Sequence, residues 1–163
     1  MNQRLVEWDR LDLRILGSRL LGVASDAIRR AGAPVHLQGI DFREGEAEVA
    51  GTVRKGISVP FRFFLRTISI EGRTVRLPIE QLTVAGFLPV PALLFRLADG
   101  LGAVEGVAID PERKTVVISV DRFLPRFLDV EIESVRIIQG GVRVALGRGG
   151  ADLPAPEELN GPA

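Results

Sequence analysis

The sequence predicts an α+β fold: a strongly curved antiparallel β-sheet wrapped around one long N-terminal helix, with a second short apolar helix. Three observations predict it. Apolar residues recur at helical spacing in residues 17–31, and alternating apolar and polar residues fill much of the chain from 35 to 147. Three of the alternating stretches also change parity midway. Such a change requires either a β-bulge or a strand that passes from one covered face to another, and we expect strongly coiled strands in both cases.

The composition indicates one globular domain, at residues 1–147. The chain has 163 residues, of which 46% are hydrophobic and 26% charged, values typical of a protein with its own core. Residues 148–163 are rich in Gly, Pro and acidic residues, so we expect a disordered tail. The 21 basic and 21 acidic residues cancel, which argues against a general nucleic-acid binder.

The first helix is expected at residues 17–31. It ends clearly, because Gly32 and then Pro34 follow it. Its beginning is open. The helix starts either earlier, near Asp9 or Asp12, or after a short extended lead-in, which is indicated by the alternation of Leu11, Leu13 and Ile15.

Strands follow this helix. Residues 35–43 and 46–54 form a hairpin around Glu44–Gly45. The stretch 57–65 places alternate apolar residues on one face, and the other parity takes over at Ile68 and Ile70. After a turn at Glu71–Gly72, the strand in residues 73–86 changes parity in the same way.

The second half of the chain begins with the short apolar helix, expected at residues 88–102, where Pro91 suits the first helical position. Two strands, 104–110 and 114–120, come next. A last hairpin turns at Gln139–Gly141, and its first strand changes parity between Ile132 and Val135.

The sequence offers no catalytic constellation, no metal site and no cofactor motif. It has no cysteine, which excludes disulfides and thiolate chemistry. His36 is the single histidine, and no Gly-x-Ser-x-Gly elbow accompanies it. The alternating Glu44, Glu46 and Glu48 are typical of a solvated strand face.

The order of elements, together with the segment FLPRFLDVEIESVRIIQGGVRVALG at 123–147, resembles the tubular lipid-binding (TULIP, BPI-like) superfamily. It is most similar to the bacterial envelope-type branch of unknown or lipid-related function. The resemblance covers residues 17–147 and implies a curved sheet around a long helix, with a lipid-accessible apolar interior. Most such relatives are binders or carriers and some are lipid hydrolases. No catalytic residue carries over, because no catalytic motif matches.

Three functions are therefore weighed. The first is non-enzymatic binding of a lipid or another elongated apolar ligand between helix and sheet. The second is a structural or interaction domain with a filled core, self-associating as a homodimer. The third is a lipid hydrolase, which needs a carboxylate with a raised pKa in an apolar pocket. For the first function, the expected lining residues are Phe61, Phe63, Leu65, Leu77, Ile79, Leu94 and Leu97.

The N-terminal segment carries charges throughout and has no apolar run before a cleavage site. No stretch approaches the ~20 apolar residues that span a bilayer. We therefore expect a cytoplasmic protein, whose partners are an apolar small molecule or lipid, a second copy, or a membrane surface contacted peripherally.

Overall fold

The protein is mostly β-structure, with 58% of it in strands and 18% in helices. The computed structural model describes residues 4–85, 90–101 and 104–152. Its strands form three sheets, one of seven strands and two of three. The prediction of an α+β fold, with one sheet wrapped around a long N-terminal helix, is wrong. Alternation along the chain identifies strands, but it carries no information about which distant strands pair.

The seven-stranded sheet has the order β3-β4-β5-β7-β9-β8, and β6 pairs with the first half of β7. All its pairings are antiparallel, and the hairpin turn expected at Glu44–Gly45 is present, with Gly45 at φ 79°. Its strands are β3 (Val35–Arg43), β4 (Glu46–Lys55), β5 (Ile57–Leu65), β6 (Ser69–Glu71), β7 (Thr74–Val84), β8 (Val107–Asp110) and β9 (Thr115–Ser119).

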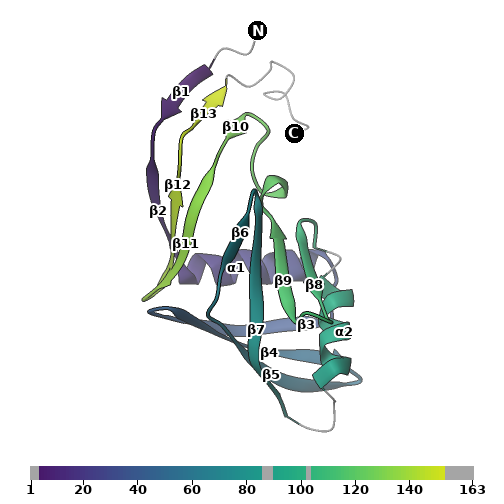
Figure 1. Ribbon diagram of the computed structural model, residues 1–163. Coiled ribbons are helices and arrows are strands. Elements are labelled where there is room, and N and C mark those ends of the chain that lie inside the picture. Colours follow the sequence, from purple (N-terminus) through teal and green to yellow (C-terminus); the bar gives the residue numbers. More distant parts are fainter. Residues whose placement is uncertain (1–3, 86–89, 102–103, 153–163) are drawn as a thin grey trace.

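The two smaller sheets form one long three-stranded arc, which we call the ribbon. Their orders are β1-β13-β10 and β11-β12-β2, and each strand of one continues along the chain into a strand of the other. In Figure 1 the ribbon curves along the left, with its concave side toward the seven-stranded sheet. Its strands are β1 (Arg4–Trp8), β2 (Leu11–Leu16), β10 (Leu128–Asp129), β11 (Ile132–Ile138), β12 (Gly141–Leu146) and β13 (Gly149–Asp152).

Helix α1 (Gly17–Arg30) follows β2 directly and contacts β2, β12 and β3, where the ribbon meets the larger sheet (Figure 1). Its end matches the sequence, with Gly32 at φ 66° and Arg29 and Arg30 in the last turn. Its start does not extend back to Asp9, because Leu11–Leu16 form a strand, and the extended lead-in is the correct alternative. A helix of 14 residues is about 21 Å long and packs beside the sheets. The second helix is α2 (Val90–Leu101).

Two of the three expected parity changes coincide with irregular pairing, whereas the one between Leu65 and Ile68 falls in the connection from β5 to β6. In β7, Glu80 lies opposite Phe64 and Thr83 lies opposite Arg62, so two residues of β7 face the single Phe63. Gln81, one of those two, has φ 50°. This is a β-bulge. It lies within residues 79–84 of β7, which pair with β5, whereas the preceding residues 74–78 pair with β9. A register shift in β11 likewise falls between Ile132 and Ser134.

The disordered tail expected from residue 148 does not begin there, because β13 pairs with both β1 and β10. The glycines that suggested disorder are required by close approach. A Cβ on Gly149 would lie 2.4 Å from the Asp129 carbonyl oxygen, and one on Gly150 would lie 2.7 Å from the Val6 carbonyl oxygen. The rest of the expected tail, residues 153–163, lies outside the described residues.

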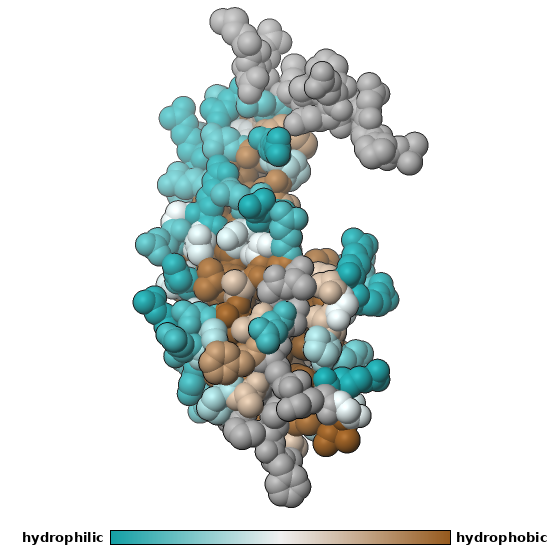
Figure 2. Space-filling view, turned by 90° about the vertical axis from the view of Figure 1, so that its right-hand side faces the viewer, coloured by the Kyte–Doolittle hydropathy of each residue, from teal (hydrophilic) through white to brown (hydrophobic). Residues whose placement is uncertain are grey.

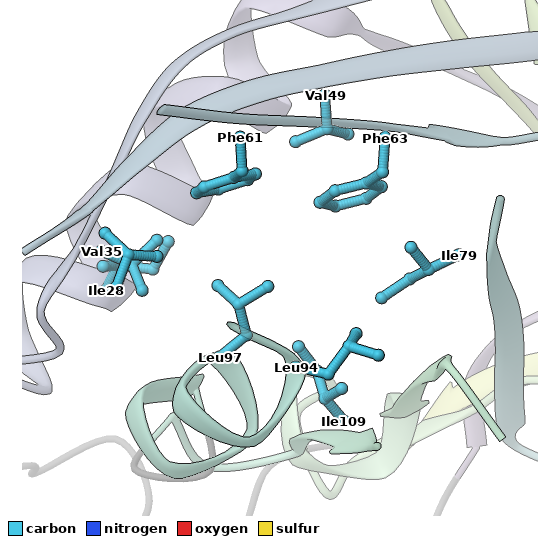
Figure 3. Close-up of a cluster of buried hydrophobic side chains, with 10 residues drawn as sticks. Ile28, Val35, Val49, Phe61, Phe63, Ile79, Leu94, Leu97 and Ile109 are labelled. Atoms are coloured by element: carbon cyan, nitrogen blue, oxygen red, sulfur yellow. The ribbon is translucent and has the colours of Figure 1, made fainter. Parts of the chain in front are cut away.

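The main core lies between the seven-stranded sheet and the two helices (Figure 3). Phe61 and Phe63 stack with ring centroids 5.9 Å apart, and Leu94 and Leu97 of α2 are 2% and 1% exposed. A second, smaller core joins the larger sheet to the ribbon. Its buried members are Phe42, Ala47 and Ile137.

Candidate functional site

The seven residues expected to line a ligand site lie largely within the main core. Five of them, Phe61, Phe63, Ile79, Leu94 and Leu97, are buried in one cluster (Figure 3). Leu65 packs at the edge of both cores. Leu77 is half-buried opposite Val116 of β9 and is not a member of the main cluster. The close packing of the five side chains supports a core role, and ligand contact by these residues stays a prediction.

A different apolar surface lies on the concave side of the ribbon. Residues that pair across strands share one face of a sheet. The pairings of β2, β12 and β11 therefore align nine apolar side chains on one face, which we call the inner face. In three rows it comprises Leu11, Leu146 and Ile132; Leu13, Val144 and Val135; and Ile15, Val142 and Ile137.

The inner face faces the larger sheet, because Ile137 and Val142 pack against Phe42 of β3 in the second core. Its exposed members lie on β2, whereas Leu146 of β12 is buried. On β2, Leu11, Leu13 and Ile15 are 37%, 45% and 36% exposed. Viewed from the concave side, brown side chains extend into the upper half of the molecule with teal ones beside them (Figure 2). The inner face is thus an apolar strip that starts in the second core and is exposed along its β2 edge.

The opposite, outer face of the same three strands is polar. Arg14, Arg143 and Arg136 form one row across β2, β12 and β11. Within the described part of the chain, none of the three forms an ion pair. These arginines border a surface depression of ≈ 510 Å³, whose lining also includes Arg10, Asp12 and Ser134. The lower half of the ribbon therefore has one apolar and one cationic face.

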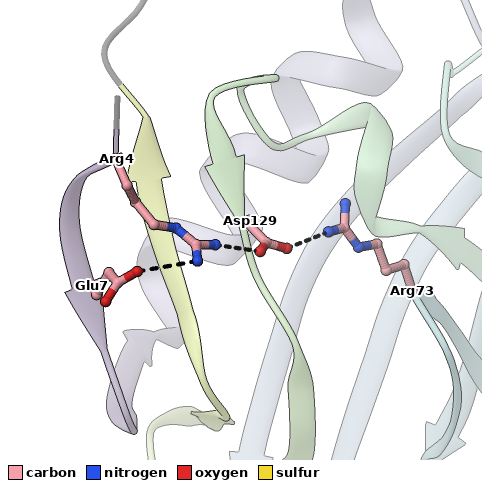
Figure 4. A network of polar contacts seen from close by, with 4 residues as sticks. All are labelled: Arg4, Glu7, Arg73 and Asp129. Carbon is pink, nitrogen blue, oxygen red and sulfur yellow. Dashed lines mark hydrogen bonds and ion pairs between the residues drawn. The ribbon is translucent and has the colours of Figure 1, made fainter. Parts of the chain in front are cut away.

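A network of charged side chains lies at the far end of the ribbon (Figure 4). Arg4 donates to Asp129 at 2.6 Å and to Glu7 at 3.3 Å. Asp129 also accepts a hydrogen bond at 3.4 Å from Arg73, which lies in the β6–β7 turn. Arg73 in turn donates to Asp121 at 2.7 Å. The network therefore links the ribbon to the other sheet across the concave side, beyond the apolar rows.

Among the described residues, the pKa shifts that are resolved belong to three arginines. The pKa of Arg73 is raised above its usual value, chiefly by its hydrogen bond to Asp121. The pKa values of Arg66 and Arg43 are raised chiefly by their hydrogen bonds to Glu46 and Asp41. These shifts only keep the three cations charged. None of the described polar or charged residues is buried, so no described carboxylate has the apolar environment that a hydrolase would need.

The single histidine is not part of a triad among the described residues. His36 lies exposed on β3 opposite Thr52. It borders a depression of ≈ 370 Å³ together with Arg54 and Ser58. The described residues also contain no group of three or more His, Cys, Asp or Glu side chains that could hold a metal ion.

Comparison with protein-family models, with curated proteins and with solved structures finds no match for this chain. The resemblance to the tubular lipid-binding superfamily therefore stays an expectation from the sequence. In the described residues, neither helix combines the length and the apolar character needed to cross a membrane.

Sequence reasoning missed the inner face as a candidate site, although part of its signal was visible. The alternation of Leu11, Leu13 and Ile15 indicated an extended segment. Its partner β12 lies about 130 residues away in the chain, and only the pairing shows that the two apolar sets lie on one face.

Proposed function

We propose that this chain is a non-enzymatic binding protein that holds a lipid acyl chain, or a similar elongated apolar group, along the inner face of the ribbon. One observation carries the proposal: three consecutive rows of apolar side chains line a concave sheet face, and the row members on β2 remain more than a third exposed. Contiguous exposed apolar surface with a polar border is typical of binding sites.

The shape of the strip favours an elongated ligand. Leu11 and Ile15 are four residues apart on β2, which is about 14 Å along a strand. The strip is three strands wide and has the second core at one end. At the other end stands the charged network of Arg4, Glu7, Asp129 and Arg73. A ligand with an apolar tail and a polar end fits this order of surfaces.

The proposal is tested by native mass spectrometry of the purified protein, followed by organic extraction and lipid analysis. Val135→Asn places an amide in the middle row on β11, and Arg136→Asn is its control, one residue along the same strand on the outer face. We expect a bound acyl lipid in the parent protein and the control, and its loss in Val135→Asn.

An apo mass for the parent protein, or equal lipid in both variants, would exclude the inner face as the site. An apo protein would favour the second function, an interaction domain with a filled core. The expected cytoplasmic location remains part of the proposal, and cell fractionation with an antibody to the chain tests it.

A further inference from the structure

Strand β2 is an edge strand of the ribbon. Among the described strands it pairs with β12 alone, and no labelled element lies alongside its other edge in Figure 1. Such edges are commonly shortened, bulged or occupied by Pro or Lys, because free main-chain groups attract another strand. The six residues of β2, LDLRIL, contain neither Pro nor Lys, and their pairing with β12 is regular throughout.

The main-chain groups that point toward the open edge can be identified. The Gly17 N–H donates to the Gly140 carbonyl at 2.9 Å, so Leu16 and Gly141 form a non-hydrogen-bonded pair. Alternation along the ladder then directs the N–H and C=O groups of Leu11, Leu13 and Ile15 toward β12. The same groups of Asp12 and Arg14 point outward and are available to a partner strand.

We propose that a second copy of this chain occupies this edge, with β2 pairing antiparallel to β2 of the partner around a two-fold axis at Leu13. In this register Asp12 lies opposite the partner's Arg14, and Arg14 lies opposite the partner's Asp12. Both pairs exchange main-chain hydrogen bonds and place opposite charges side by side, which stabilises a cross-strand pair. Leu13 meets its own copy, and Leu11 meets the partner's Ile15.

The other registers are unfavourable. Centring the pairing on Asp12 opposes two aspartates, and centring it on Arg14 opposes two arginines; like charges directly opposite destabilise a sheet. Centring it between two residues sets charged side chains opposite apolar ones, which mixes the inner and outer faces. Centring it on Leu11 or Ile15 keeps the faces matched but leaves most of β2 unpaired, because Arg10 and Gly17 lie outside the strand. The register centred on Leu13 matches charge and face over five of the six residues of β2.

The pairing would give Asp12 and the arginine row partners of opposite charge, and it would extend the inner face. Among the described residues, Asp12 has only a 3.7 Å ion pair with Arg10, which directly precedes β2, and its side chain is 59% exposed. The partner's aspartate would bring a carboxylate to the row of Arg14, Arg143 and Arg136. The inner faces of the two copies would form one continuous apolar surface. The inference rests on the edge of β2 and is independent of whether a ligand binds the inner face.

A charge exchange tests the register. Size-exclusion chromatography with light scattering should give the parent protein twice the 17.7 kDa mass of one chain. Asp12→Arg and Arg14→Asp should each lower the mass to that of a monomer, because each opposes like charges twice. The double variant restores both opposite-charge pairs and should restore the dimer. Circular dichroism confirms that each variant is folded.

Disulfide cross-linking locates the two-fold axis, since the chain contains no cysteine of its own. Leu13→Cys places two thiols at a non-hydrogen-bonded position, within the range a disulfide requires, and should give a covalent dimer on oxidation. Leu11→Cys alone should not, whereas a mixture of Leu11→Cys and Ile15→Cys should. Val23→Cys on α1, where the parent side chain is 64% exposed, is the control for random collision.

A parent protein that stays monomeric at 100 μM would overturn the inference. So would a dimer that tolerates either single charge reversal, because its interface would lie elsewhere. Failure of the folded double variant to re-form the dimer, or cross-linking of Leu13→Cys no faster than Val23→Cys, would overturn the register. Lipid analysis of the same samples tests the ligand proposal separately.

Discussion

Replacing Leu97 by alanine tests whether the cluster between α2 and the seven-stranded sheet is a filled core or a ligand site. Leu97 is 1% exposed and lies in the cluster with Phe61, Phe63 and Leu94. If these side chains pack on one another, truncation leaves a cavity that the two elements cannot close without moving. If Leu97 instead lines a ligand cavity, truncation only enlarges a space that already exists.

The two cases differ in magnitude. Leu→Ala removes three carbons, and at about 0.8 kcal/mol each their transfer alone costs about 2.4 kcal/mol. The residual cavity raises the expected loss of unfolding free energy to about 3–4 kcal/mol. Phe95, on the same helix, is 57% exposed, so Phe95→Ala should cost about 1 kcal/mol or less.

Urea unfolding measures both variants. Trp8 is the only tryptophan and lies on the ribbon, so its fluorescence reports unfolding away from the mutated helix, while circular dichroism reports the whole chain. With a slope of about 2 kcal/mol per molar urea, Leu97→Ala should lower the midpoint by roughly 1.5–2 M. Coincident transitions by the two probes are needed for this conversion.

A Leu97→Ala midpoint within about 0.5 M of the Phe95→Ala midpoint would refute the filled-core interpretation. The cluster would then be loosely packed, and the lining residues expected from the sequence would again be the best candidates for ligand contact. Comparing bound lipid in the two variants would decide that question.

Two further predictions concern single positions in the sheets. Gly51→Ala should destabilise the protein by about 1–3 kcal/mol, because the new Cβ would lie 2.5 Å from the His36 carbonyl oxygen and 2.8 Å from Phe61 Cζ. Gly39→Ala is the control, since a Cβ there would have nothing within 4 Å. Equal urea midpoints for the two variants would contradict this prediction. Arg143→Thr should stabilise the protein by about 0.5 kcal/mol at low salt, because it removes the middle charge of the row with Arg14 and Arg136. That gain should shrink in 1 M salt, and Arg62→Thr, which breaks an ion pair with Glu48 at 3.3 Å, should show no such gain.

Local features of the fold could be predicted from the sequence because their causes are local. The turn at Glu44–Gly45 needs a glycine at positive φ, and so does the end of helix α1, where Gly32 follows the last helical residue, Arg30, by two positions. The parity change in β7 follows from the bulge at Gln81, a local consequence of one extra residue.

The arrangement of the sheets could not be predicted, because it depends on pairings between distant segments. Strand β2 pairs with β12, and β1 pairs with β13, across nearly the whole chain. Residues 148–152 resembled a disordered tail in composition. Their glycines are instead the only residues that fit where β13 runs between Asp129 and Trp8, an environment that no local window contains.

The side-chain order of β1 and β2 sets the length of the apolar strip. Pairing of these strands with β12 and β13 keeps the same register across the bend at Asp9–Arg10, since Leu11 lies opposite Leu146 and Trp8 opposite Gly149. Alternation therefore continues through the bend, and Glu7 falls on the side of Leu11. The row of Glu7 also contains Gly150 and Asp129, and Asp129 accepts a hydrogen bond from Arg73 of the larger sheet.

On β1 and β2 the inner face thus changes from apolar to charged because of the residues themselves, since the register of these strands is unbroken across the bend. On β10 and β11 the register shifts by one residue across the bend, because Asp129 pairs with Gly150 and Ile132 with Leu146. Val6 and Trp8 take the outer face instead, where Trp8 lies against Gly149 with its indole Nε1 buried and without a hydrogen-bond partner among the described residues. An apolar ligand on the inner face is therefore confined to the rows between Ile15 and Leu11. Extending the strip requires a change at Glu7 and Asp129, and that change would also break the contact that joins the ribbon to Arg73.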